Sequence, residues 1–85
     1  MSITSSDIGN LVRRVRRQLK LTQKELALTS GTGLRFIIDL EKGKPTCEIG
    51  KVLIALQSLG IDLTFVPPAM DTYSEQLSTR SAHGA

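Results

Sequence analysis

Side chains that can bind a polyanion are concentrated in the first 60 residues of this 85-residue chain. Ten Lys and Arg residues stand there against five acids, which gives that part a formal charge of +5. From Ile61 onward, one Arg stands against three acids, and the formal charge is −2. The distribution of charge along the chain is therefore more informative than the net charge of +3. Because the basic part is also the part with helical periodicity, a polyanionic partner is favoured.

The residue types that enzyme catalysis requires are sparse. His83 is the only histidine, and Cys47 is the only cysteine. No glycine-rich phosphate loop follows a strand, and we identify no carboxylate pair in an apolar setting. We therefore expect no enzyme activity, no cofactor, and neither a catalytic nor a metal site. A single cysteine excludes an internal disulfide, so Cys47 is interpreted as structural in a reducing compartment.

The stretch TQKELALTSGTGLRFIIDLEKGK, which begins at Thr22, predicts two short helices joined by a glycine turn. Thr22 is a good N-cap, and Glu25 completes a capping box. Gly31 can adopt the positive φ that ends the first helix, and the second begins at about Gly33 and ends before Gly43. This arrangement is a helix-turn-helix unit, in which the second helix enters the major groove of DNA.

Two further helices are predicted to pack on this unit. Ser6 or Asp7 can cap the first of them, and Thr46 or Cys47 can cap the last. The first has an apolar stripe of helical period at Ile8, Leu11, Val12, Val15 and Leu19. The last has a similar stripe at Ile49, Val52, Leu53, Leu56 and Leu59. The expected core of the helix-turn-helix consists of Leu26, Ala27, Ile37 and Leu40.

Residues 61–66 alternate apolar and polar side chains for most of their length and are the only strand candidate. A single strand leaves its backbone N–H and C=O groups unpaired. Pairing with the same strand of a second copy would form a ribbon across a dimer axis, with Ile61, Leu63 and Phe65 as dimerisation residues. The alternative is an extended segment that packs on the helices of its own chain.

The chain divides into two parts on this interpretation. Residues 1–66 form a helix-turn-helix DNA-binding and dimerisation domain, and residues 67–85 form a flexible C-terminal tail. Apolar runs are much shorter than the ~20 residues that a membrane span requires. Residues 1–10 lack the charged-then-apolar order of a signal peptide. We therefore expect no membrane partner and a cytoplasmic location.

The motif also resembles a known family. TQKELA, followed by Gly31 and then LEKGK, resembles the phage repressor and Cro type of helix-turn-helix, the XRE family, over about residues 8–60. More narrowly, RFIIDLEKGKPT and GKVLIALQSLGIDL resemble HipB-like antitoxins. The resemblance implies a mostly α, lambda-repressor-like domain of four to five helices, with one C-terminal β-strand that pairs across a homodimer. It further implies a palindromic double-stranded DNA operator and a HipA-like kinase toxin as partners.

The resemblance assigns roles to individual residues. Gln23, at the start of the first motif helix, would hold a phosphate and support a side chain of the second helix. The outward first-turn positions of the second helix correspond to Leu34, Arg35 and Phe36. Arg35 is the best candidate base reader, because its guanidinium fits O6 and N7 of guanine, and the alternatives are a phosphate contact or free surface. Asp39 could accept from cytosine, although orientation of Arg35 is favoured.

The second helix departs from the phage pattern in two respects. Gly33 replaces the usual capping Ser or Thr. Leu34, Phe36 and Ile38 are apolar where polar side chains are common. They could contact thymine methyl groups or follow DNA shape, or they could pack inside, and packing is favoured for Phe36.

Basic side chains also follow the second helix. Lys42 and Lys44 are expected to contact phosphate, as is Thr46 through its hydroxyl or backbone N–H. Glu41 is expected to form a salt bridge within the motif, with Arg14 or another arginine of the first helix. The remaining arginines of that helix could meet phosphates or an acidic protein partner.

Three hypotheses for function follow. The first is a dimeric repressor that is the antitoxin of a HipA-like kinase toxin and regulates its own operon. The second is a stand-alone repressor without a toxin. The third is a protein-interaction module that has lost DNA binding, which the apolar outer face of the second helix would explain. A kinase-like neighbouring gene favours the first over the second, and salt-sensitive DNA binding favours both over the third.

Overall fold

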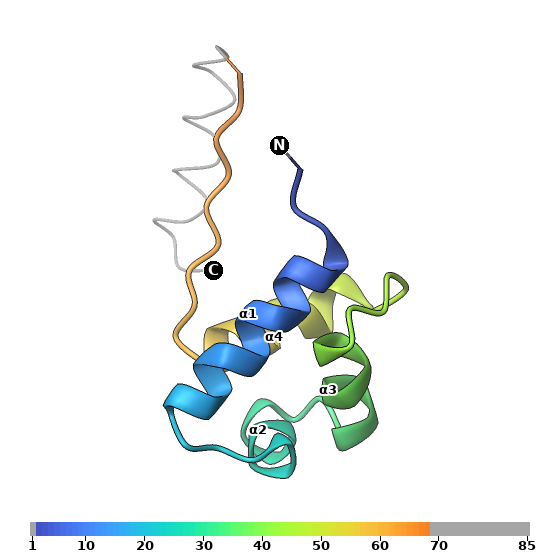
Figure 1. The fold of residues 1–85 in the computed structure, drawn as a ribbon, viewed down its shortest axis with the longest axis vertical. Helices are drawn as coiled ribbons and strands as arrows, with labels where there is room; N and C mark the ends of the chain where they lie inside the picture. The colour runs from blue at the N-terminus through green and yellow to red at the C-terminus, as the bar shows by residue number, and fades with distance from the viewer. Residues whose placement is uncertain (1, 69–85) are drawn as a thin grey trace.

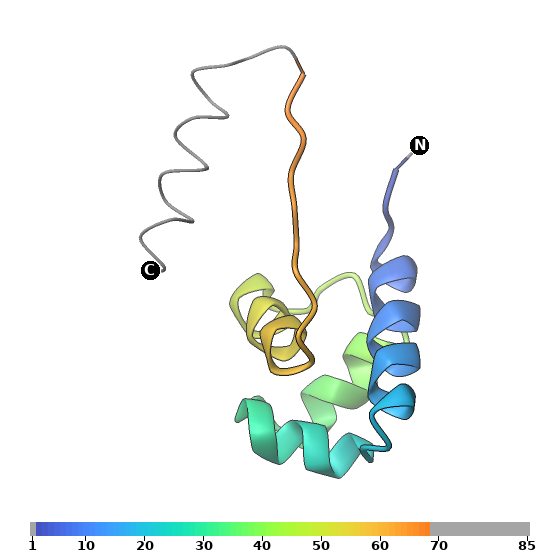
Figure 2. The same ribbon diagram turned by 90° about the vertical axis from the view of Figure 1, so that its left-hand side faces the viewer.

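Four helices account for most of residues 2–68, the part of the chain that the computed structural model describes (Figure 1). They are α1 (Ser5–Gln18), α2 (Gln23–Ser30), α3 (Leu34–Glu41) and α4 (Ile49–Ser58). α3 packs against both α1 and α2, and α2 also packs against α4. Figure 2 shows α2 and α3 at one end of the molecule, with the segment after α4 leaving at the other. The mostly α fold is confirmed, and residues 69–85 of the predicted tail lie outside the described residues.

α1 begins earlier than predicted. Its N-cap is Thr4, whose Oγ1 accepts a hydrogen bond from the backbone N–H of Asp7 at 3.1 Å. The carboxylate of Asp7 in turn accepts from the backbone N–H of Thr4 at 2.9 Å. The prediction of Ser6 or Asp7 as the cap was wrong, because Asp7 occupies the third helical position of a reciprocal capping box.

The turn between α2 and α3 has the predicted chemistry. Thr22 and Glu25 form the capping box at the start of α2, with hydrogen bonds of 3.0 and 2.7 Å. Gly31 ends α2 with a φ of 70°, and Gly33 precedes α3 with a φ of 96°. Both values lie in the region that glycine adopts without steric cost, so the tight turn depends on these two residues.

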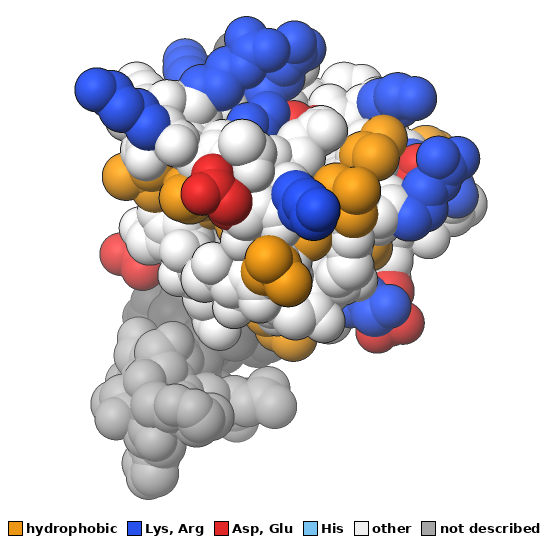
Figure 3. Space-filling model, turned by 90° about the horizontal axis from the view of Figure 1, so that it is seen from below, with side chains coloured by type: hydrophobic (Ala, Val, Ile, Leu, Met, Phe, Trp, Pro, Cys, Tyr) orange, Lys and Arg blue, Asp and Glu red, His pale blue; other side chains and the backbone are white. Residues whose placement is uncertain are grey.

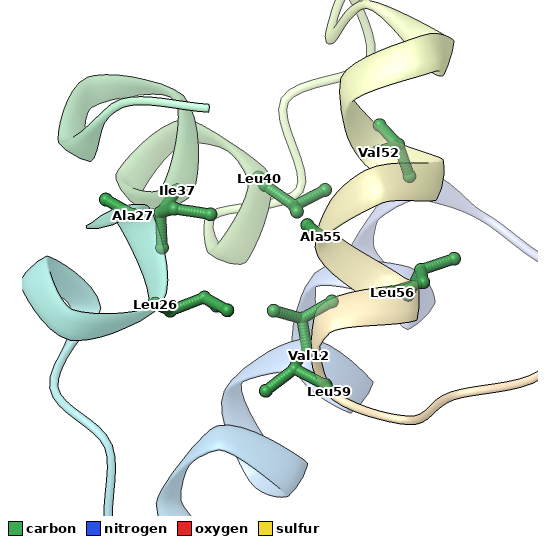
Figure 4. Packing of buried hydrophobic residues seen from close by; sticks show 9 residues of the cluster. All are labelled: Val12, Leu26, Ala27, Ile37, Leu40, Val52, Ala55, Leu56 and Leu59. Atoms are coloured by element: carbon green, nitrogen blue, oxygen red, sulfur yellow. The ribbon is translucent and has the colours of Figure 1, made fainter. Parts of the chain in front are cut away.

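The core is aliphatic and draws on all four helices. Its nine residues are Val12, Leu26, Ala27, Ile37, Leu40, Val52, Ala55, Leu56 and Leu59 (Figure 4). The four predicted core positions of the helix-turn-helix are all buried. Ala55 was not predicted although it is fully buried on the same face as Val52 and Leu59, because a small alanine side chain is a weak signal in an apolar pattern. Leu19 and Ile49, which were assigned to the stripes, are more than half exposed because they lie at helix ends.

α4 begins at a residue that the sequence did not single out. Its N-cap is Glu48, with extended backbone and no side-chain capping hydrogen bond. The prediction of Thr46 or Cys47 as the cap was therefore wrong. The start of α4 follows from packing of Val52 and Leu56 into the core rather than from local cap chemistry.

Residues 61–67 contain neither helix nor strand in the single chain and run away from the helices (Figures 1 and 2). Ile61 packs against the core, and its backbone N–H donates to the carbonyl of Leu56 at 2.9 Å. Leu63, Phe65 and Val66 are exposed. The alternative interpretation, in which the segment packs on the helices of its own chain, therefore applies only to Ile61. Pairing of this segment across a dimer stays a prediction.

Candidate nucleic-acid interface

The outward face of α3 is defined by the residues that it buries. Ile37, Leu40 and Glu41 face the interior. Arg35, Asp39 and Lys42 stand on the opposite side, since positions i, i+4 and i+7 of a helix share one face. The Arg35 side chain is 82% exposed, so its five donors are accessible to a groove of DNA. α3 therefore presents a polar and mainly basic row outside the fold.

Asp39 links two of the predicted DNA-contact residues. Its Oδ1 lies 3.7 Å from Nε of Arg35, and its Oδ2 lies 3.5 Å from Nζ of Lys44. The predicted i, i+4 pairing with Arg35 is confirmed, and the pairing with Lys44 was not foreseen because it depends on the path of the loop after α3. With one acid between two cations, this group keeps a net positive charge, so the carboxylate can approach phosphates at reduced cost.

A buried ion pair joins α1 to α3. Nε and Nη2 of Arg16 donate to the two carboxylate oxygens of Glu41 at 2.6 and 3.0 Å, and Nη1 donates to the carbonyl of Leu21 at 2.7 Å. These hydrogen bonds with Glu41 raise the pKa of Arg16 above its ordinary value. The partner is thus Arg16 and not Arg14. Four residues after Val12, Arg16 shares the buried face of α1, whereas Arg14 is exposed.

Gln23 is linked to α3 through the same Glu41 carboxylate. Its Nε2 donates to Oε1 of Glu41 at 3.1 Å. The predicted contact between Gln23 and a side chain of α3 is therefore present, and the partner is the last residue of that helix. This hydrogen bond holds the first residue of α2 beside the end of α3, where a phosphate contact is predicted.

The apolar residues of α3 divide into two groups. Phe36 is partly buried against the core, and Nζ of Lys51 lies 5.9 Å from the centre of its ring. Of the two interpretations of Phe36, packing is the one that this arrangement supports. Leu34 is exposed at the start of the helix and Ile38 is half-buried, so both remain open to a groove of DNA.

The predicted phosphate contacts after α3 lie on an anchored loop. Lys42, Lys44 and Thr46 are all exposed. The hydroxyl of Ser5, in the first turn of α1, donates to the carbonyl of Gly43 at 2.8 Å. Sequence reasoning missed this anchor, because the two residues are 38 positions apart and no local pattern links them.

A surface groove adjoins this face, and we name it the α1–α3 groove. It is lined by Arg13, Arg16, Arg17, Leu21, Thr22, Gln23, Ile38, Glu41 and Lys42. Figure 3 views the α2 side of the molecule and shows Lys and Arg side chains at the edge formed by α1 and at the end of α3, with apolar side chains between them. The groove thus continues the basic face of α3 onto α1.

Metal-ligand clusters and membrane-spanning helices are both absent from residues 2–68. This part of the chain contains no group of three or more His, Cys, Asp or Glu side chains placed to hold a metal ion. No helix within it is long and apolar enough to cross a membrane. Two short helices joined by a glycine turn, with an exposed basic row on the second, define a helix-turn-helix DNA-binding domain.

The chain belongs to the helix-turn-helix family, whose model matches residues 12–66. It is 57% identical over 65 residues to the uncharacterized HTH-type transcriptional regulator y4mF of Sinorhizobium fredii (strain NBRC 101917 / NGR234). That alignment covers 76% of this chain and 86% of the relative. The protein is therefore a DNA-binding transcriptional regulator of the helix-turn-helix type, as the sequence resemblance implied.

Two solved structures share the fold. The HipB–O4 20mer complex superposes with a TM-score of 0.71 at 25% sequence identity and covers 79% of this chain and 94% of that chain. A complex of a HipB variant with an O2 20mer gives the same TM-score and identity and covers 79% of this chain and 93% of that chain. The HipB-like form of the fold is thus confirmed.

Proposed function

We propose that the protein is a sequence-specific transcriptional repressor that acts as a homodimer on a palindromic DNA operator in the cytoplasm. The observation that carries this proposal is the outward face of α3, where Arg35 is almost fully exposed beside Asp39 and Lys42. In a helix-turn-helix, this face enters the major groove. A bidentate contact from Arg35 to guanine would contribute about 1–3 kcal/mol of discrimination against other bases.

The homodimer is supported by the segment after α4. Leu63, Phe65 and Val66 expose apolar side chains, and within the described part of the chain residues 62–66 make no backbone hydrogen bonds. A second copy of the segment would pair these backbone groups and cover the apolar side chains. It would also fix two α3 helices at the spacing of successive major grooves, roughly 34–36 Å.

The antitoxin role is the finer part of the proposal. The solved structures with this fold include HipB, at 25% identity, and the sequence motifs resemble the same subgroup. We therefore propose that the protein regulates its own operon and neutralises a HipA-like kinase toxin. The exposed outer sides of α1 and α4 offer surfaces away from α3 for that toxin, including Leu53 and Ile54 of α4.

DNA binding is tested by fluorescence anisotropy, in which the full chain is titrated into a duplex from upstream of the gene. Circular dichroism verifies that each protein is folded. We expect binding that weakens steeply with salt, and Arg35→Ala should lower the preference for this duplex over a scrambled one by about 5- to 150-fold for each half-site. Arg14→Ala removes the same charge from the outer side of α1 and serves as the control. Equal losses for both variants would show that Arg35 supplies charge and no base discrimination.

The toxin partner is tested by co-purification with the protein encoded beside this gene. We expect a stable complex in which kinase activity is suppressed, and a folded neighbour that does not associate would refute the antitoxin role. DNA binding without any such partner would leave a stand-alone repressor. Absence of DNA binding at low salt by a folded dimer would instead favour a protein-interaction module.

A further inference from the structure

The α1–α3 groove holds a concentration of positive charge, of which the predicted DNA contacts use only Lys42. Arg13, Arg16, Arg17 and Lys42 line it together with one acid, Glu41. Its net formal charge is therefore +3, which equals the charge of the whole 85-residue chain. The remaining lining groups are uncharged. A shallow hollow on the outer side of α1 has the same net charge, from Arg13, Arg14 and Arg17.

Most of this positive charge is available to a ligand. Arg16 is buried and neutralised by Glu41, so these two contribute little to an incoming group. Arg13, Arg17 and Lys42 are exposed, and no carboxylate within residues 2–68 lies within 4.0 Å of their charged nitrogens. Three cations that form no ion pair within residues 2–68 therefore share one groove, where they attract an anion and repel each other in its absence.

The position of the groove identifies the anion. Ile38 lies on α3, Lys42 is its C-cap, and both line the groove, so DNA in contact with α3 passes along this edge. The start of α2 is at the same place, where Gln23 is held by Glu41. Arg13 and Arg17 are one helical turn apart on α1 and face this side together.

We propose that Arg13 and Arg17, with Lys42, bind a phosphate of the DNA strand that flanks the major groove contacted by α3. This inference rests on the proposed function, and it extends the DNA contact surface beyond the helix-turn-helix onto α1. The phosphate lies between the end of α1 and the end of α3, which fixes how far α3 enters the groove. Because phosphates carry no sequence information, this contact adds affinity and register but no base preference.

Arg14 provides a matched control from the same helix. It lies between Arg13 and Arg17 in sequence and is exposed, but it does not line the α1–α3 groove. It borders a second, shallow hollow on the outer side of α1, which Arg13 and Arg17 also line together with Asn10 and Gln18. Arg14→Ala therefore alters this hollow and leaves the α1–α3 groove intact. Arg14→Ala therefore changes the net charge of the chain by the same amount as Arg13→Ala or Arg17→Ala, without removing the proposed contact.

The test is a salt titration of DNA affinity with the full chain on a specific and a scrambled duplex. It compares the wild type, the single variants Arg13→Ala, Arg17→Ala and Arg14→Ala, which each remove one charge, and the double variant Arg13→Ala/Arg17→Ala. We expect the double variant to flatten the plot of log affinity against log salt by about one for each bound protomer. Its loss of affinity should be largest at low salt and equal on both duplexes. Arg14→Ala should leave the slope within error of the wild type.

The outcomes separate this inference from the proposed function. If the wild type binds DNA and the double variant has the slope of Arg14→Ala, the phosphate site is refuted while DNA binding stands. If the double variant loses affinity only on the specific duplex, the arginines read bases and the inference is wrong. If the folded wild type does not bind DNA, both are refuted, and an acidic protein surface becomes the ligand to test for Arg13 and Arg17.

Discussion

Replacing Glu41 with glutamine removes the carboxylate that compensates the buried Arg16 guanidinium. The Glu41 side chain is 4% exposed and accepts three hydrogen bonds, two from Arg16 and one from Gln23. Breaking one partner of a buried pair costs about 3–5 kcal/mol. In this variant Arg16 keeps its hydrogen bond to the carbonyl of Leu21, at 2.7 Å, and the new glutamine amide still offers one acceptor oxygen. We therefore expect a loss at the lower end, about 3 kcal/mol.

This loss can be measured as a change in melting temperature. For a domain of this size, about 3 kcal/mol corresponds to a decrease of roughly 12–24 °C, which circular dichroism detects easily. Because the pKa of Arg16 is raised, its contribution is present below the ordinary pKa and is lost only as the pH rises through the raised value. The Arg16 contribution should therefore be constant between about pH 6 and pH 9.

Two variants make the result interpretable. Glu48→Gln is the control, since Glu48 is exposed and forms no ion pair within the described residues. It should change stability by no more than about 0.5 kcal/mol. Replacing both partners, Arg16→Met with Glu41→Leu, should recover much of the loss, because no buried charge remains. If Glu41→Gln melts within a few degrees of Glu48→Gln, the pair does not join α1 to α3 as described.

Three other predictions test separate parts of the structure. Gly9→Ala should destabilise the fold by about 1–3 kcal/mol in urea unfolding, because its Cβ would collide with the backbone carbonyl of Leu40. Gly50→Ala, whose Cβ would make only an ordinary contact with the Glu48 side chain, should stabilise the fold by about 0.5–1 kcal/mol. The opposite order would refute the close approach of α1 and α3. Asp39→Asn should strengthen binding to scrambled DNA and lower the preference for the specific duplex by about twofold. The reason is that the ion pair between Asp39 and Arg35, worth ~0.2–0.5 kcal/mol, no longer orients Arg35. An unchanged preference in fluorescence anisotropy would show that Asp39 does not orient Arg35. Leu63→Pro should shift the sedimentation coefficient towards that of the monomer, because proline cannot donate a hydrogen bond in the proposed ribbon. Unaffected association would refute the ribbon.

Local chemistry explains what the sequence predicted correctly. The capping box at Thr22 and Glu25 and the positive φ of Gly31 depend only on residues within one turn, so the motif could be placed from its pattern. The box between Thr4 and Asp7 has the same spacing and was nevertheless missed, because Ser6 is also a good cap type. The start of α4 could not be found this way, since no side chain caps it.

The contacts that could not be predicted from the sequence join segments that are far apart in it or depend on the path of a loop. The choice of Arg16 over Arg14 follows from its phase relative to the buried Val12, a signal that the apolar stripe of α1 already contained. The pairing of Asp39 with Lys44 and the anchor from Ser5 to Gly43 both require the path of the loop after α3. No periodicity encodes that path.

Selection of bound duplexes from a random DNA pool by the purified full chain would show whether two copies of α3 read a palindromic DNA sequence. We expect enrichment of a two-fold symmetric sequence, with half-sites about one helical turn apart and a G·C pair in each half-site. The Arg35→Ala variant should no longer select that G·C pair. Failure of the folded wild-type protein to enrich any sequence above background at low salt would contradict this expectation.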